Sequence, residues 1–255
     1  MTLFRIRNLC VDVPGRRLLH DLSTDIPQGA VTALIGHNGS GKSTLLKTLA
    51  RQMKGSGSVL FESRELSDWV RQDFARRLAF LPQNMPPAEG MTVRELIALG
   101  RYPWHGALGR FGPGDHEAVD RAMLECGVVD LAERVVDSLS GGERQRSWLA
   151  MTVAQQAGTL LLDEPISALD IGHQVEVLSL LRRMCHDQNR SAVIVLHDVN
   201  MAARFCDHVV ALRDGRHVFE GTNTSLMQAD TLCEIFGLQM QILTCADGTP
   251  VAFPS

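Results

Sequence analysis

Apolar runs alternate along the chain with segments that have the mixed periodicity of amphipathic helices. The runs lie at 31–36, 78–83, 159–165, 191–198 and 208–215. Two of them contain stretches that are apolar on consecutive positions, LLL at 160–162 and AVIVL at 192–196. Such stretches are typical of strands buried on both faces of a parallel sheet. Strands that alternate with helices in this way predict an α/β domain.

The middle of the chain, from about residue 87 to 150, departs from this alternation and has helical patterns instead. These patterns cover 92–99 and roughly 115–126, and a third begins near Ser140. The middle of the chain therefore predicts a helical insert within the α/β domain.

The first predicted helix of the insert has recognisable signals at both ends. Thr92 and Glu95 have the spacing of a capping box, in which each side chain bonds the other residue's backbone N–H. Gly100 stands where the helix should end, as glycine commonly does. The pattern predicts a short helix with well-defined boundaries.

The last thirty residues form a separate pattern. The sequence ADTLCEIFG indicates a short helix, and two extended runs follow it on either side of Asp247 and Gly248. An Asp-Gly pair between extended runs predicts a β-hairpin. We therefore expect a main domain at 1–225, with its helical insert, and a carboxy-terminal extension at 226–255.

Composition excludes several classes of protein. The 255 residues hold 25 basic and 29 acidic side chains, a net charge of −4, so we expect no nucleic-acid partner. The six cysteines include no C-x-x-C pair, which argues against disulfide frameworks and zinc sites. Arg5 and Arg7 interrupt the apolar start, which argues against a signal peptide. No run approaches the roughly 20 apolar residues of a membrane span, so we expect no membrane-spanning helix.

The sequence GHNGSGKST at 36–44 fits the phosphate-binding P-loop pattern G-x-x-x-x-G-K-[ST]. It follows an apolar strand and precedes a helical pattern, so backbone N–H groups and the helix dipole can face phosphate oxygens. An ordinary glycine-rich turn is the alternative. The predicted ATP-binding residues are Gly36, Asn38, Gly39, Ser40, Gly41, Lys42, Ser43 and Thr44.

Two adjacent carboxylates follow the apolar run LLL at 160–162. P-loop NTPases hold Mg²⁺ through the P-loop hydroxyl and an aspartate at such a strand end, here Ser43 and Asp163. Glu164 is the candidate general base for the attacking water. The alternatives are that the pair only caps the strand end, or only binds metal.

The sequence LSGGERQR at 139–146 resembles the signature of ATP-binding cassette (ABC) ATPases, commonly L-S-G-G-Q. Ser140, Gly141 and Gly142 would open a helix and give a second phosphate site, with Glu143 in place of the usual glutamine. The resemblance implies a head-to-tail homodimer, in which each ATP lies between one chain's P-loop and the other chain's signature.

Three further residues extend the resemblance. Gln83 in LPQ matches the family's Q-loop glutamine, which would contact Mg²⁺ and the γ-phosphate side. Asp170 in SALD matches the D-loop and would face the partner chain. His197 in VLHD matches the switch histidine, although a histidine after an apolar strand is by itself more often structural. Gln83 and His197 join Glu164 in the predicted catalytic set.

The resemblance covers about residues 3 to 225 and implies an α/β P-loop NTPase fold with a RecA-like core. An amino-terminal β subdomain and an inserted helical subdomain would complete it. The implied cofactors are ATP and Mg²⁺. Two departures stand out: the segment VDVPGRR lacks the aromatic residue that commonly stacks on adenine, and Ile166 replaces a common threonine.

The segment PAEGMTVRELIALGRYPWHGALGRFG resembles the ATPase subunits of iron(III)–siderophore importers, ferric hydroxamate systems above all. The implied partners are a polytopic membrane permease and, indirectly, a periplasmic or lipoprotein siderophore-binding protein. The chain would lie on the cytoplasmic face of the bacterial inner membrane. The cargo assignment rests on this resemblance alone, and haem, vitamin B12 or another metal chelate is the alternative cargo.

Tyr102 and Trp104 lie in this same segment. One interpretation is that they pack the core of the helical insert. The other is that they receive a cytoplasmic helix of the permease, since aromatic side chains are favoured at such interfaces. Two other functions stay open at this point: a soluble ABC ATPase acting in translation or repair, and a nucleotide-binding regulatory protein.

Overall fold

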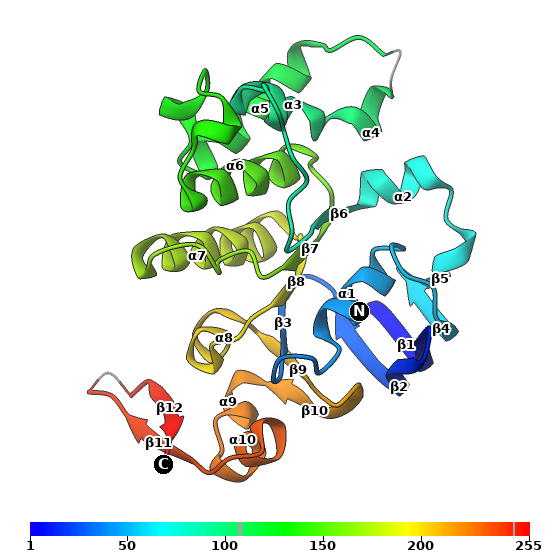
Figure 1. Cartoon of the computed structure of the whole chain (residues 1–255), viewed down its shortest axis with the longest axis vertical. Coiled ribbons are helices and arrows are strands. Elements are labelled where there is room, and N and C mark those ends of the chain that lie inside the picture. Colours follow the sequence, from blue (N-terminus) through cyan, green and yellow to red (C-terminus); the bar gives the residue numbers. More distant parts are fainter. Residues whose placement is uncertain (107–108, 247) are drawn as a thin grey trace. The chain divides into compact units, whose positions relative to one another are not determined.

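The computed structural model describes residues 1–106, 109–246 and 248–255. These residues form two compact units, whose elements are labelled in Figure 1. The terminal unit comprises Met1–Trp69 and Ser191–Ser255, and the middle unit comprises Val70–Arg190. The helical insert predicted at about 87–150 lies inside the middle unit, and the proposed domain boundaries stay a prediction.

The amino-terminal part of the terminal unit is an antiparallel sheet in the order β2-β1-β4-β5. Side chains of β1 alternate, so that Phe4 and Ile6 are buried while Arg5 and Arg7 are exposed. The strands are β1 (Thr2–Val13), β2 (Arg16–Pro27), β4 (Ser56–Phe61) and β5 (Arg64–Glu65), followed by the 3-10 helix η1 (Leu66–Asp68). This alternation gives the sheet one apolar and one polar face.

The rest of the terminal unit is built around parallel strands. Strand β3 pairs in parallel with β8 on one side and with β9 on the other, and β10 pairs antiparallel with β9. All residues of β3 and β8 are buried, as their apolar runs predict. The strands are β3 (Val31–Ile35), β8 (Ser191–Val195), β9 (His208–Arg213) and β10 (Arg216–Thr222). The helices are α1 (Lys42–Leu49), α8 (Val199–Phe205), α9 (Asn223–Leu226) and α10 (Ala229–Phe236).

The carboxy-terminal hairpin is present as predicted. Strands β11 (Met240–Thr244) and β12 (Pro250–Pro254) pair antiparallel, with Thr244 opposite Pro250. Asp247, the first residue of the predicted Asp-Gly turn, lies outside the described residues. The helix predicted from ADTLCEIFG is α10.

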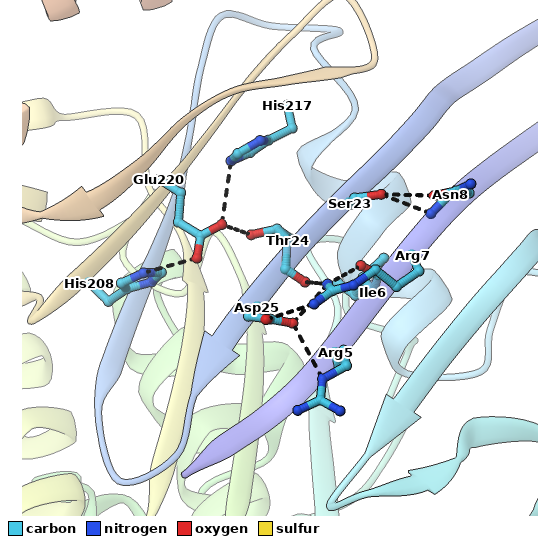
Figure 2. Close-up of polar contacts among 10 residues, drawn as sticks. All are labelled: Arg5, Ile6, Arg7, Asn8, Ser23, Thr24, Asp25, His208, His217 and Glu220. Carbon is cyan, nitrogen blue, oxygen red and sulfur yellow. Dashed lines mark hydrogen bonds and ion pairs between the residues drawn. The ribbon is translucent and has the colours of Figure 1, made fainter.

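The carboxylate of Glu220 connects β2 to β10 within the terminal unit (Figure 2). Thr24 Oγ1 donates to Glu220 Oε2 over 2.6 Å. The Nε2 atoms of His208 and His217 each lie 3.7 Å from a Glu220 carboxylate oxygen. Desolvation lowers the pKa of His208 below its ordinary value, against the attraction of Glu220. These polar contacts connect the first sheet to β9 and β10.

In the middle unit, β6 pairs in parallel with β7, and helices make up most of the remainder. The strands are β6 (Leu78–Leu81) and β7 (Thr159–Asp163). The helices are α2 (Arg71–Arg77), α3 (Val93–Leu99), α4 (Tyr102–His105), α5 (Pro113–Glu125), α6 (Gly141–Ala154) and α7 (Ile171–Gln188), with 3-10 helices η2 (Val129–Leu131) and η3 (Val136–Ser138). All three predicted helices of the insert are confirmed, as α3, α5 and α6.

Helix α3 begins and ends where the sequence predicts, but its end has a different cause. Thr92 and Glu95 form the predicted capping box. Gly100 is the C-cap, yet its backbone is right-handed, so no left-handed turn requires glycine there. A Cβ at Gly100 would lie 2.2 Å from the Met151 carbonyl oxygen of α6. Glycine is needed because the backbone of α6 approaches so closely.

Arg101, immediately after α3, is a buried connection between three helices. It is 6% exposed, and its Nε donates to Asp115 Oδ1 of α5 over 2.8 Å. Its Nη1 donates to the Ala154 carbonyl at the end of α6 and to Gln156 Oε1. The N–H of Gly112, and then Arg101, hold the pKa of Asp115 below its usual range.

Removing Asp115 should destabilise the protein much more than removing a surface partner from the same helix. The Arg101 and Asp115 side chains are 8% and 14% exposed, so Asp115→Ala leaves a buried charge and should lower the free energy of unfolding by about 3 kcal/mol. Asp120→Ala is the matched control, because the exposed pair of Asp120 with Arg94 should contribute less than about 1 kcal/mol.

Denaturant unfolding at pH 7 measures the free energy of unfolding of both variants. Because the pKa of Asp115 is depressed, its contribution is present above the ordinary carboxyl pKa and is lost as pH falls through the folded value. Equal losses in the two variants at pH 7 would contradict the role of the buried pair.

Candidate nucleotide site

The P-loop connects β3 to α1 along a path that only glycine permits at its first residue. Gly36 has φ 137°, and a Cβ there would lie 2.0 Å from the Leu212 carbonyl oxygen of β9. No side chain can occupy that space without moving the backbone of β9. The start of the loop is therefore fixed by a neighbouring strand as well as by its own sequence.

The remainder of the loop has the properties of an anion cradle. Lys42 is 5% exposed, and its Nζ donates to the carbonyls of Gly36 and His37, each over 2.9 Å. Helix α1 begins at Lys42 without a side-chain cap at Gly41, so its positive end faces the loop. A Cβ at Gly39 would meet no atom within 4 Å, so the loop has open space on that side. These residues fit a phosphate chain.

The adenine-stacking position stays unassigned. Phe4 is fully buried, and its ring stacks on Phe61 with the centroids 4.9 Å apart. It therefore belongs to the core. VDVPGRR, the segment without an aromatic residue, forms the tip of the β1–β2 hairpin.

His197 also belongs to the terminal unit. It follows β8, is exposed, and comes directly after Leu196, whose N–H donates to the Leu34 carbonyl of β3. The terminal unit therefore contains the P-loop and the predicted switch histidine at the carboxyl ends of adjacent parallel strands. Ligands of α/β proteins bind at such strand ends.

In the middle unit, the two predicted acidic residues stand at the end of β7. Asp163 is 1% exposed and is the last residue of the strand. Glu164 follows with φ 55°, a left-handed conformation that is uncommon for a residue other than glycine. Strain of this kind is concentrated at functional sites.

Gln145 of α6 holds this strained turn, although it is not among the predicted site residues. It is 4% exposed, its Nε2 donates to the Glu164 carbonyl over 3.0 Å, and its Oε1 accepts the N–H of Ala168 over 3.0 Å. One buried amide therefore connects the signature helix, the residue after β7, and the D-loop. In the sequence, only its position in GERQR, beside the signature residues, points to a role for Gln145.

The signature residues open α6 as predicted. Ser140 is the N-cap, and it forms a capping box with Glu143: Ser140 N–H donates to Glu143 Oε2 over 2.8 Å, and Ser140 Oγ accepts from Glu143 N–H. These bonds, the backbone N–H of Ser140 first, hold the pKa of Glu143 below its usual range. The glutamate that replaces the usual glutamine therefore has a structural role, for which either side chain has the needed acceptor.

The D-loop aspartate is the N-cap of α7. Asp170 Oδ1 accepts the His173 N–H over 2.9 Å, and Oδ2 lies 2.8 Å from His173 Nδ1. The backbone bond to His173, followed by the side-chain bond, lowers the pKa of Asp170. Ile166, the second departure from the family pattern, is 8% exposed. The described contacts give no functional explanation for it.

A cavity of about 490 Å³ in the middle unit brings predicted residues together. Its lining includes Gln83 and the five residues after it, Gly141 and Gln145 of the signature helix, and Ser167 of the D-loop. The structure thus gathers the Q-loop, signature and D-loop around one space within this unit.

Tyr102 and Trp104 differ in how firmly they are held. The Trp104 indole N–H donates to the Gln155 carbonyl over 2.7 Å, and the guanidinium groups of Arg76 and Arg101 lie 5.6 and 5.2 Å from its ring centroid. Trp104 is 39% exposed, whereas Tyr102 is 57% exposed. Trp104 therefore packs within the middle unit and also presents a surface, while Tyr102 lies mainly on the surface.

Comparison with known proteins decides the family. The sequence pattern described as ABC transporter matches residues 19–167, which include the P-loop and the signature. The chain belongs to the ABC transporter family. One solved structure is described as an inward-facing conformation of a metal-chelate type ABC transporter. A chain of that structure superposes on this chain with a TM-score of 0.85 at 25% identity. The likeness covers 100% of this chain and 98% of that one. The predicted fold of an ABC ATPase is thus confirmed.

Two curated relatives of this cassette have names that describe ATP-binding proteins of import or transport systems. The iron(3+)-hydroxamate import ATP-binding protein of Bacillus subtilis (strain 168) is 41% identical, over 96% of this chain and 91% of that protein. The ferric enterobactin transport ATP-binding protein of Escherichia coli (strain K12) is 41% identical, over 92% and 87%. Within the described residues, no helix has the length and apolar character needed to cross a membrane.

Substitution of Gly36 should remove nucleotide binding through its contact with Leu212. Gly36→Ala forces a Cβ against the Leu212 carbonyl and displaces the loop, so affinity for a fluorescent ATP analogue should fall at least about tenfold. Gly127→Ala is the control. Gly127 also has positive φ, 63°, but a Cβ there meets no atom within 4 Å.

The two variants should show a similar helical signal in circular dichroism and differ in nucleotide titration. Unchanged affinity in Gly36→Ala would show that the close approach to β9 does not set the shape of the loop.

Proposed function

We propose that this cassette hydrolyses ATP to energise the import of an iron(III)–siderophore through a partner membrane permease. The observation that carries the proposal is its 41% identity to an iron(3+)-hydroxamate import ATP-binding protein across 96% of the chain. The ferric enterobactin transport relative is equally identical to this chain. Overall identity therefore supports ferric chelates as the class of cargo and does not distinguish among them. The choice of a hydroxamate rests on the resemblance of the segment that contains Tyr102 and Trp104.

The proposed assembly contains two copies of the cassette and a polytopic permease. A siderophore-binding protein in the periplasm, or attached as a lipoprotein, would deliver the cargo to the permease. The cassette would lie on the cytoplasmic face of the inner membrane. Its net charge of −4 supports the absence of a nucleic-acid partner.

In this proposal the P-loop residues bind the phosphates of ATP. The backbone N–H groups at the start of α1 face the phosphate oxygens, and Lys42, already turned into the loop, contacts the β- and γ-phosphates. Ser43, Gln83 and Asp163 would hold Mg²⁺. When bound, this ion supplies neutralisation of the charge on the phosphate oxygens.

Glu164 is the proposed general base that orients the attacking water and takes its proton. Its backbone is held by Gln145, so the side chain leaves the strand end in a defined direction. His197 would contact the γ-phosphate, and Gln83 would connect the state of the nucleotide to the middle unit. Gln83 lines the same cavity as Gly141 and Ser167, which supports such a connection.

The signature would act on the partner's nucleotide. Among the described helices, α1 after the P-loop and α6 after Ser140 both have starts suited to phosphate. A head-to-tail homodimer uses both for each ATP: one chain's P-loop and the other chain's Ser140, Gly141 and Gly142. Asp170, whose side chain is 69% exposed at the start of α7, would face the partner chain.

Tyr102 and Trp104 are the proposed permease contact. The contacts of Trp104 with Gln155 and Arg76 support both earlier interpretations, because they fix the indole while 39% of it stays exposed. Tyr102, 57% exposed on the same helix, is the better candidate for a direct contact with the permease.

Replacing Glu164 should stop hydrolysis without preventing ATP binding. Glu164→Gln removes the base but retains size and backbone contacts, so steady-state ATPase should fall by about 10²- to 10⁴-fold while affinity for ATP stays near that of the wild type. Glu176→Gln on α7 is the control, since it makes the same charge change at an exposed position. Normal turnover in Glu164→Gln would remove this residue from the mechanism.

Replacing Tyr102 should uncouple transport from hydrolysis. Tyr102→Ala removes an exposed contact, so basal ATPase of the isolated cassette should stay unchanged while siderophore uptake by cells falls at least about fivefold. Leu124→Ala is the control, because Leu124 is an apolar side chain, 72% exposed, on α5. If Tyr102→Ala instead unfolds the protein or loses basal ATPase, the residue belongs to the core.

Uptake of radiolabelled ferric hydroxamate in a strain deleted for the gene tests the function directly. The wild-type gene should restore uptake, and the Glu164→Gln gene should not. Parallel assays with ferric enterobactin, haem and vitamin B12 separate the possible cargoes. If the uptake of none of these compounds depends on the gene, the proposed import function is wrong, and a soluble ABC ATPase becomes the better interpretation.

A further inference from the structure

The turn between β9 and β10 packs against the P-loop, although no motif marks it. Asp214 and Gly215 have φ values of 50° and 73°, and Arg213 pairs with Arg216 across them. Two consecutive positive φ values are the geometry of a tight hairpin turn, for which Asp-Gly is a favoured sequence. The turn therefore has one defined shape, and its two residues make separate contacts.

The backbone of Gly215 connects the P-loop to β2. Its N–H donates to the Ser40 carbonyl over 3.0 Å, and its carbonyl accepts the N–H of His20 over 2.8 Å. A Cβ at Gly215 would lie 2.3 Å from the Leu18 carbonyl, so these backbones are in close contact. The P-loop, the turn and β2 thus form one hydrogen-bonded layer inside the terminal unit.

The side chain of Asp214 makes a second contact with the P-loop. Its Oδ1 lies 3.3 Å from His37 Nε2, while His37 Nδ1 lies 2.8 Å from the carbonyl of Asn38. The imidazole therefore stands between a carboxylate and a carbonyl of the loop. His37 occupies one of the unspecified positions of the P-loop motif, so the motif itself gives it no role.

Arg213 extends this set of contacts to the carboxy-terminal helix. Its Nε lies 3.9 Å from Asp214 Oδ2, and its Nη1 donates to the Glu234 carbonyl at the end of α10 over 2.8 Å. A cation at the carboxyl end of a helix is favoured by the helix dipole. The order of contacts is therefore α10, Arg213, Asp214, His37 and the P-loop.

We propose that Asp214 is a positioning residue for the P-loop, and that α10 is coupled to nucleotide binding through Arg213 and Asp214. This inference rests on the proposed nucleotide site, because it concerns the shape of the loop that binds the triphosphate. The pair is solvent-exposed, with His37 38% and Asp214 76% exposed, so its effect on affinity is modest. The carboxy-terminal extension then stabilises the loop that binds ATP.

Asp214→Asn tests the contact while it preserves the turn, because asparagine also tolerates a left-handed backbone. The dissociation constant for a fluorescent ATP analogue, and KM for ATP, should rise about two- to fivefold, with kcat at saturating ATP unchanged. Asp21→Asn is the matched control: Asp21 is exposed, has φ 50°, and makes the same charge change in β2.

A double-mutant cycle with His37→Asn separates the contact from a general loss of structure. Once either partner is replaced, replacing the other should have little further effect on affinity. Arg213→Gln should also raise the dissociation constant in the wild-type background, whereas Arg216→Gln on the same hairpin should not. No further rise from Arg213→Gln is expected in the Asp214→Asn background.

Unchanged affinity in Asp214→Asn, or fully additive effects with His37→Asn, would overturn the positioning role. Unchanged affinity in Arg213→Gln would overturn the coupling to α10. If the wild-type chain binds no nucleotide at all, the proposed nucleotide site fails instead, and the wild-type titration separates the two cases.

Discussion

The approach of Gly36 to the Leu212 carbonyl is the constraint on which the nucleotide site depends. Because no side chain fits between them, β3 must turn at this glycine, and the loop beyond it is directed back over Lys42 and the start of α1. The constraint comes from β9, a strand more than 170 residues further along the chain. The P-loop is therefore shaped by its tertiary surroundings as well as by its motif.

A comparable arrangement organises the middle unit around Gln145. This buried amide joins the signature helix to the Glu164 carbonyl and to the Ala168 N–H of the D-loop. The strained backbone of Glu164 is thus held by the helix that carries the signature. A displacement of α6 would move the backbone of the proposed base, Glu164. This contact gives a physical basis for coupling between the position of the signature helix and the rate of hydrolysis.

Much of the architecture could be predicted from local pattern. Strands β3 (Val31–Ile35) and β8 (Ser191–Val195) are each apolar at four of five positions, and the spacing of Thr92 and Glu95 defines the start of α3. Such signals depend only on neighbouring residues. The P-loop motif then supplied the candidate role of Lys42, and the family resemblance supplied those of Ser140 and Asp170. The fold that the resemblance implied is confirmed by comparison.

What escaped prediction depends on contacts between distant residues. Gly100 was expected to end α3, but glycine is required there because the backbone of α6 approaches so closely. Arg101 bonds the Ala154 carbonyl across 53 positions, and no local pattern reports that bond. The roles of Gln145 and Asp214 are hidden in the same way, because each acts on a motif that lies elsewhere in the sequence.

In the proposed head-to-tail homodimer, one chain's P-loop works with the other chain's signature. The most direct measurement is the ATPase rate of a mixture of two inactive variants, Lys42→Ala and Ser140→Arg. In a head-to-tail dimer, the mixed pair contains one intact site, formed by the P-loop of Ser140→Arg and the signature of Lys42→Ala. Mixing should therefore restore a substantial fraction of wild-type activity, up to about one active site per mixed dimer. A mixture that stays as inactive as its components would contradict the cross-chain site.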